Sequence, residues 1–116
     1  MECSVEYAQH ISDVFETMYI YRSIVVCQHP STMYHTARLL KHLDFPVETV
    51  TIFSCRDALH KYANGAARML IMSEAFAQLL MQYAKEVIEH ANVVFCLDGV
   101  ETCIPPTDGK KFFFFP

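Results

Sequence analysis

Four short apolar runs, separated by segments with helical periodicity, restrict the fold of this chain more than any other feature. The run Ser23–Cys27 is β-branched and apolar without alternation, which is typical of a strand covered on both faces. Further strands are predicted at Val47–Ile52, Arg68–Met72 and Val93–Leu97, and helices at about Tyr7–Met18, Thr32–Leu43, Arg56–Tyr62 and Ser73–His90. This alternation predicts an α/β domain in three layers, with a mainly parallel sheet of at least four strands and helices on both faces.

Short polar side chains predict where three of these helices begin. We expect Ser31 or Thr32 to cap the second helix, and Ser73 to cap the fourth. Ser54, with Asp57 three residues later, resembles a capping box that uses the shorter acid, and it predicts the start of the third helix.

The chain carries few charged residues. They make up 19% of the sequence, against roughly 25% in an ordinary soluble domain, and the net charge is −4. The nine Lys and Arg residues are dispersed, so we expect RNA to bind weakly at most. Apolar side chains left on the outside of so small a domain form a patch, which is typical of a surface that binds protein. No membrane span or signal peptide is apparent, which predicts a cytoplasmic protein that does not enter membranes.

The five cysteines and six histidines form no recognisable site. They include no CxxC pair and no spacing typical of zinc ligands. Cys27 with His29, or Cys55 with His60, could form a nucleophilic pair, but no third group that would orient the histidine is visible. We therefore predict reduced, buried thiols, and no catalytic, metal-binding or cofactor-binding residues.

Several segments resemble the C-terminal RecA-like lobe of DEAD-box RNA helicases. KYANGAARMLIMSEAFA is similar to the helix, turn and strand of that lobe that end in Ala/Ser-Thr-Asp. SIVVCQHPS resembles the strand and loop that begin the lobe, HTARLLKHLDFPVETVTI the following helix and strand, and ANVVFCLDG a later strand. The resemblance covers about residues 22–99 and implies a RecA-like fold.

The departures from the helicase pattern fall on the residues that serve ATP. Glu74 stands where the family has aspartate, and Gln78 and Leu79 replace an arginine-glycine pair. The segment VETCIPPTDGKKFFFFP, which follows the last strand expected above, contains no arginine, although the family carries its arginine finger there. Since that arginine stabilises charge on the transferred phosphoryl group, the comparison implies a pseudo-helicase lobe that is not an enzyme.

Two functions remain open. The first is a non-catalytic interaction module that self-associates or scaffolds other proteins, and the second is one lobe of an RNA helicase that binds RNA and ATP together with a missing partner lobe. An orphan lobe that begins at Met1 also resembles the N-terminal helicase-C-like domain of the Yb group of Tudor-domain proteins. That resemblance implies self-association in cytoplasmic, perinuclear RNA granules of the piRNA pathway.

Two segments are candidates for the contact between copies. The stretch QYAKEVIEHA adds about two helical turns relative to the helicase loop, and we predict a homodimer through its apolar residues Met81, Tyr83, Val87 and Ile88. We divide the chain into a helicase-like domain, residues 1–104, and a C-terminal tail, residues 105–116. The four phenylalanines of the tail could extend the sheet as a strand, dock on a second copy, or begin a further segment.

Overall fold

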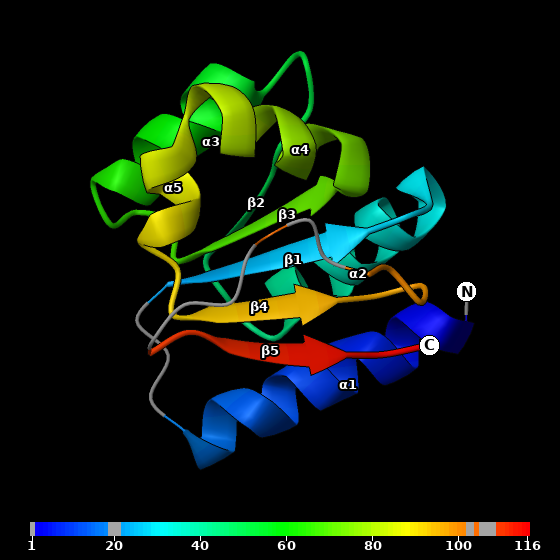
Figure 1. Cartoon of the computed structure of the whole chain (residues 1–116). Coiled ribbons are helices and arrows are strands. Elements are labelled where there is room, and N and C mark those ends of the chain that lie inside the picture. The colour runs from blue at the N-terminus through cyan, green and yellow to red at the C-terminus, as the bar shows by residue number, and fades with distance from the viewer. Residues whose placement is uncertain (1, 19–21, 102–103, 105–108) are drawn as a thin grey trace.

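The computed structural model describes residues 2–18, 22–101, 104 and 109–116, and its centre is a sheet of parallel strands. The strands lie in the order β2-β3-β1-β4-β5 (Figure 1). Their bounds are β1 (Ser23–Cys27), β2 (Val47–Thr49), β3 (Met69–Ser73), β4 (Val93–Cys96) and β5 (Lys111–Phe114). Every neighbouring pair is parallel, so the predicted α/β class and the parallel sheet are confirmed.

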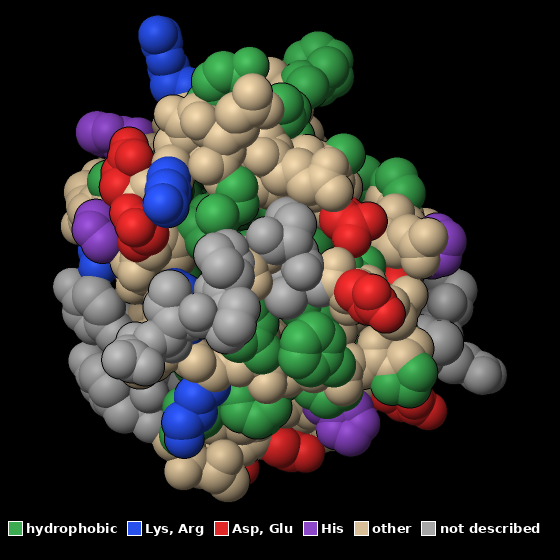
Figure 2. Space-filling view, in the orientation of Figure 1, with side chains coloured by type: hydrophobic (Ala, Val, Ile, Leu, Met, Phe, Trp, Pro, Cys, Tyr) green, Lys and Arg blue, Asp and Glu red, His purple; other side chains and the backbone are tan. Residues whose placement is uncertain are grey.

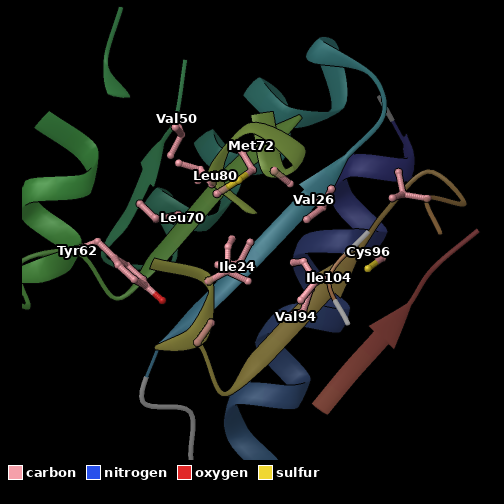
Figure 3. Close-up of a cluster of buried hydrophobic side chains, with 14 of the residues drawn as sticks. Ile24, Val26, Val50, Tyr62, Leu70, Met72, Leu80, Val94, Cys96 and Ile104 are labelled. Carbon is pink, nitrogen blue, oxygen red and sulfur yellow. The ribbon is translucent and has the colours of Figure 1, made fainter. Parts of the chain in front are cut away.

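Helices cover both faces of this sheet, as the apolar strands predict. One face carries α1 (Glu2–Thr17) and α2 (Pro30–His42), and the other carries α3 (Cys55–Ala63), α4 (Glu74–Tyr83) and α5 (Lys85–Glu89). Strand β1 shows the alternation: Val25 packs in the cluster beneath α1 and α2, while Ile24 and Val26 pack in the cluster beneath α3 and α4 (Figure 3). Because each face of β1 is buried, the strand is apolar at almost every position.

The end of α2 is fixed by a backbone motif that the sequence only hints at. The amide of Asp44 donates to the carbonyl of Lys41 at 3.0 Å, and the amide of Phe45 donates to the carbonyl of Leu40 at 3.1 Å. This pair of bonds is a Schellman motif, which needs a left-handed residue after the cap. Asp44 occupies that position with φ 64°, where glycine is favoured.

The starts of α2 and α4 differ in how they are capped. Ser73 precedes α4, and its hydroxyl accepts a hydrogen bond from the amide of Phe76 at 3.2 Å, so the predicted cap is confirmed. The prediction for α2 is wrong, because His29 is its N-cap and makes no side-chain cap bond. Pro30 occupies the first turn, which tolerates proline because its missing N–H has no partner inside the helix.

The capping box predicted for α3 is also wrong. Ser54 does precede the helix, but its hydroxyl donates to the carbonyl of Thr49 at 2.7 Å and makes no cap bond. The hydroxyl of Thr51 accepts hydrogen bonds from the amides of Phe53 and Ser54, each at 3.2 Å. These side-chain bonds fold residues 51–54 into a turn, so the strand ends at Thr49 rather than at Ile52.

The long helix predicted from Ser73 to His90 is broken in the structure. Ala84 has φ −144° and ψ 52°, which ends α4, and α5 begins at Lys85 in a new direction. The change of direction returns Ile88 to the core beneath α4, where 1% of it is exposed. Alanine is the best helix former, so tertiary packing has overridden local preference at this position.

The phenylalanines at the end of the chain form a strand, the first of the three alternatives. Strand β5 lies parallel to β4, and the amide of Lys111 donates to the carbonyl of Asn92 at 2.9 Å. Phe113 packs on the α1 side of the sheet and Phe112 on the opposite side. The sheet therefore continues beyond β4 to a fifth strand.

Candidate functional site

The carboxyl ends of the parallel strands form the edge where open α/β sheets bind ligands. Asp98 follows β4 at this edge, with φ 58°. Its carboxylate accepts hydrogen bonds from the amides of Gln28 at 3.1 Å and His29 at 3.2 Å, and from the hydroxyl of Thr32 at 3.1 Å. The carboxylate that sequence comparison places in a helicase strand motif is therefore bonded to the loop between β1 and α2.

A buried tyrosine extends this network to both ends of the described chain. Tyr7 lies on α1 and is buried, and its hydroxyl accepts a hydrogen bond from the amide of Asp98 at 3.1 Å. The same hydroxyl donates to the carbonyl of Pro116 at 2.5 Å. The edge thus joins α1, the loop after β1, the exit of β4 and the segment after β5 through polar contacts within the chain.

Two of the four arginines, Arg22 and Arg68, lie away from this cluster in the fold. The sequence has none after Arg68, and Arg68 and Arg22 precede β3 and β1 at the opposite, amino edge of the sheet. The guanidinium of Arg22 donates to the carbonyl of Tyr62 at 3.1 Å and lies 5.5 Å from the centre of the Tyr62 ring. Arg22 therefore acts as a structural clamp between β1 and the end of α3.

Glu74, which stands at the helicase aspartate position, is the first residue of α4. A carboxylate in the first turn is stabilised by the positive end of the helix dipole, so a glutamate at this position is explained without invoking a bound ligand. Gln78 and Leu79, which replace the arginine-glycine pair, are both exposed on α4.

The four residues predicted to join two copies do not share one surface. Tyr83 is 76% exposed at the end of α4, while Met81 and Val87 are half-buried and pack against the core. Ile88 is a core residue, so its expected place on the surface is wrong. The break at Ala84 separates Tyr83 from the residues that follow it.

A more exposed apolar pair lies in the loop before α3, and sequence reasoning missed it. Phe53 is 93% exposed and Ile52 is 78% exposed. Ile52 was assigned to the second strand, which Phe53 directly follows, and the signal against that assignment is the Thr51 and Ser54 pair that forms the turn. In Figure 2, hydrophobic side chains appear at several separate places at the top of the view, over the layer that contains α3 and α4, with polar side chains and backbone between them.

A shallow hollow of about 480 Å³ lies beside α2 and the edge strand β2. It is lined by Tyr34, Arg38, Lys41 and His42 from one side of α2, and by Thr49 of β2. The basic residues that appear dispersed in the sequence are thus brought together here by helical spacing. An aromatic ring beside cationic groups can contact an acidic ligand or a nucleotide base.

The structure does not support a nucleophilic role for the Cys27 thiol. This thiol is buried, and burial, followed by the nearby Asp98 carboxylate, raises its pKa far above the usual value for a thiol. Such a thiol is protonated at neutral pH and is a poor nucleophile. Within the described ranges, no cluster of three or more His, Cys, Asp or Glu side chains could hold a metal ion.

No helix in the described part of the chain is long and apolar enough to cross a membrane. No protein-family model matches the sequence, and no curated protein matches it.

Solved structures do match, and they come from a DEAD-box protein, an ATPase domain and a helicase domain. The C-terminal domain of the DEAD-box protein Dbp5 has a TM-score of 0.70 and 13% identity, over 97% of this chain and 70% of that one. The C-terminal part of the Fun30 ATPase domain has a TM-score of 0.65 and 9% identity, over 97% of this chain and 40% of that one. The Pyrococcus furiosus Hef helicase domain has a TM-score of 0.64 and 10% identity, over 98% of this chain and 25% of that one.

These likenesses define the class of fold: a RecA-like domain of the helicase C-terminal type. The resemblance expected from the sequence is confirmed at that level. Because all three identities are low, the likeness establishes the fold alone. The chain spans 40% of the Fun30 structure and 25% of the Hef structure.

Proposed function

We propose that this chain is a non-catalytic, helicase-like interaction module that self-associates or scaffolds other proteins. The observation that carries the proposal is the state of the carboxyl edge, where Asp98 is bonded to the chain's own loop and no arginine follows Arg68 in the sequence. A lobe built in this way keeps the fold, but its Asp98 carboxylate is occupied by the chain's own loop and the segment after β4 holds no arginine that could act as an arginine finger.

The surface proposed for a homodimer is the exposed side of α4. Tyr83 is its most exposed apolar residue, and Leu79, one turn earlier, is 47% exposed. Met81 and Val87 contribute only their outer atoms, because both pack against the core. Tyrosine is enriched at interfaces, since it offers a large contact area and a polar end, and a two-fold pairing of like surfaces is the commonest closed assembly.

The cellular setting we propose is a cytoplasmic RNA granule of the piRNA pathway. It follows from the sequence resemblance to the helicase-C-like domain of the Yb group, in which an orphan lobe self-associates. Other proteins of an RNA-processing assembly are then the expected partners, with RNA bound weakly at most.

The test is the molar mass in solution as a function of protein concentration. We expect the mass of the wild type to rise above that of a monomer at tens of micromolar, and Tyr83→Glu to lower it, because burying an unpaired charge at an interface is unfavourable. Tyr34→Glu is the matched control, since Tyr34 is also exposed on a helix but on the opposite face of the sheet. A wild type that stays monomeric at all concentrations would refute self-association.

The second function, one lobe of a working RNA helicase, is favoured by a single observation. The hollow beside α2 gathers Arg38, Lys41 and His42 around Tyr34. Its test is binding of single-stranded RNA and turnover of ATP by the purified chain. We expect no ATP turnover and no submicromolar RNA binding at physiological salt. RNA binding that Arg38→Glu/Lys41→Glu abolishes would favour this second function instead.

A further inference from the structure

Strand β5 is an edge strand whose outer side carries unpaired backbone groups. The amides of Lys111 and Phe115 donate to the carbonyls of Asn92 and Cys96, at 2.9 Å and 2.8 Å, so residues 111, 113 and 115 direct their backbone groups toward β4. By the two-residue period of a strand, Phe112 and Phe114 direct theirs away from the sheet. Among the described residues, none hydrogen-bonds to these outward groups.

The protective side chains of this edge, Lys111 and Pro116, stand only at its two ends. Native edge strands commonly carry charges, prolines or bulges that block a further strand. Between Lys111 and Pro116, however, all the side chains are phenylalanine, and Phe114 is 57% exposed. The rings of Phe112 and Phe114 are stacked on one face of the sheet, with centroids 6.2 Å apart. A bare, apolar edge of this kind is suited to accept another β-strand.

We propose that β5 pairs antiparallel with β5 of a second copy of this chain, which joins the two sheets into one. This inference rests on the proposed self-association and names a second surface for it. Phe112 and Phe114 are the phenylalanines whose outward groups can form hydrogen-bonded pairs, and the register that uses both of them is the one we take. In the two-fold arrangement each Phe112 faces Phe114 of the other copy, and both residues exchange their N–H and C=O bonds.

The sequence and charges of β5 favour a second copy of this chain as the partner that pairs with its edge. In this antiparallel register Phe112, Phe113 and Phe114 each face a phenylalanine of the other copy, while Phe115 faces Lys111. Lys110 and Lys111 precede the run, and an antiparallel arrangement puts the two lysine pairs at opposite ends of the joint. A parallel arrangement would bring these like charges together, which is unfavourable.

The same geometry explains why ring stacking would cross the joint. Phe112 and Phe114 lie on the face opposite Phe113, which stacks on Phe95 at 5.6 Å between centroids within its own copy. The two stacked rings of one copy then meet the two of the other in a single aromatic row on that face. The buried rings Phe95 and Phe113 remain undisturbed.

The experiment uses Tyr83→Glu as the background, so that the α4 surface does not contribute. With both surfaces the wild type should assemble beyond a dimer, Tyr83→Glu should fall back to a dimer joined through β5, and Tyr83→Glu/Phe114→Pro should be monomeric. Proline at position 114 removes an outward N–H and blocks the approaching strand, while the bonds from β5 to β4 are kept. The matched control, Tyr83→Glu/Phe114→Thr, keeps the N–H and a good strand former, so it stays dimeric with an affinity lower by roughly tenfold.

A second measurement covers the case in which the proline variant does not fold. Amide hydrogen exchange of the Tyr83→Glu protein should show Phe112 and Phe114 amides that become protected as concentration rises. Hydrogen exchange at these amides that does not change with concentration would overturn the edge pairing. A Tyr83→Glu/Phe114→Pro variant that is folded and dimeric would overturn it as well. If the wild type self-associates but the Tyr83→Glu variant is monomeric, the edge pairing is overturned and self-association through α4 stands. If the wild type itself is monomeric, self-association is refuted altogether.

Discussion

Replacing Asp98 tests whether the carboxylate at the sheet edge is structural. Asp98→Ala removes the hydrogen bonds to Gln28, His29 and Thr32, worth about 1 kcal/mol each at this partly solvated site, so about 3 kcal/mol in all. Alanine at φ 58° adds about 1 kcal/mol of backbone strain. The total of about 4 kcal/mol is a large share of the 5–15 kcal/mol by which domains are stable. Asp98→Asn, which can keep all three contacts without the charge, should cost about 1 kcal/mol.

The assay is urea unfolding followed by circular dichroism, with Asp44→Ala as the matched control. Asp44 has a similar left-handed backbone, φ 64°, and its side chain has no hydrogen bond to any residue that the structure describes. Its alanine variant therefore reports backbone strain alone. We expect Asp98→Ala to lower the free energy of unfolding by about 3 kcal/mol more than Asp44→Ala does. Equal losses would mean that the Asp98 carboxylate contributes nothing to the fold and is free to meet a ligand.

Three further outcomes follow from single contacts. Asp44→Gly should raise the free energy of unfolding by about 0.5 kcal/mol in urea titrations, because glycine suits the left-handed end of α2, and a loss would contradict the Schellman assignment. Tyr62→Phe should leave stability unchanged or raise it by up to about 1 kcal/mol, since the buried Tyr62 hydroxyl has no hydrogen-bond partner in the described chain. In thiol labelling of the folded protein, Cys27 and Cys96 should react only on unfolding, while the less buried Cys55 reacts first, and early labelling of Cys27 would argue against its burial.

The fold was accessible from the sequence because burial on both faces leaves a direct mark on strand composition. Strand β1 occupies Ser23–Cys27, as predicted, since its apolar run has no polar residue that could face water. The cap at Ser73 was accessible for a similar reason, because the bond it makes spans only three residues. Signals that act within a strand or a helical turn can be read without knowing the tertiary structure.

What the sequence concealed depends on contacts between distant residues. Ala84 breaks a helix that its own propensity favours, because the redirected α5 buries Ile88 in the core. Asp98 and Gln28 are 70 positions apart, so no local pattern marks their bond, and the carboxylate looks like a functional residue until its partners are known. The exposed Phe53 was hidden in an apolar run that ends early because side chains form a turn.

The two proposed surfaces for self-association lie on different parts of the molecule, and this decides the kind of assembly they build. Tyr83 ends a helix that covers β3 and β1, whereas β5 is the strand at the outer edge beyond β4 (Figure 1). In both proposals the surface pairs with its own copy, so either one alone would give a closed dimer. A copy that uses both binds two different neighbours, and repetition of the two contacts gives an open chain of copies. A small domain with two such surfaces is thus suited to build an extended assembly, which is the property that a granule scaffold requires.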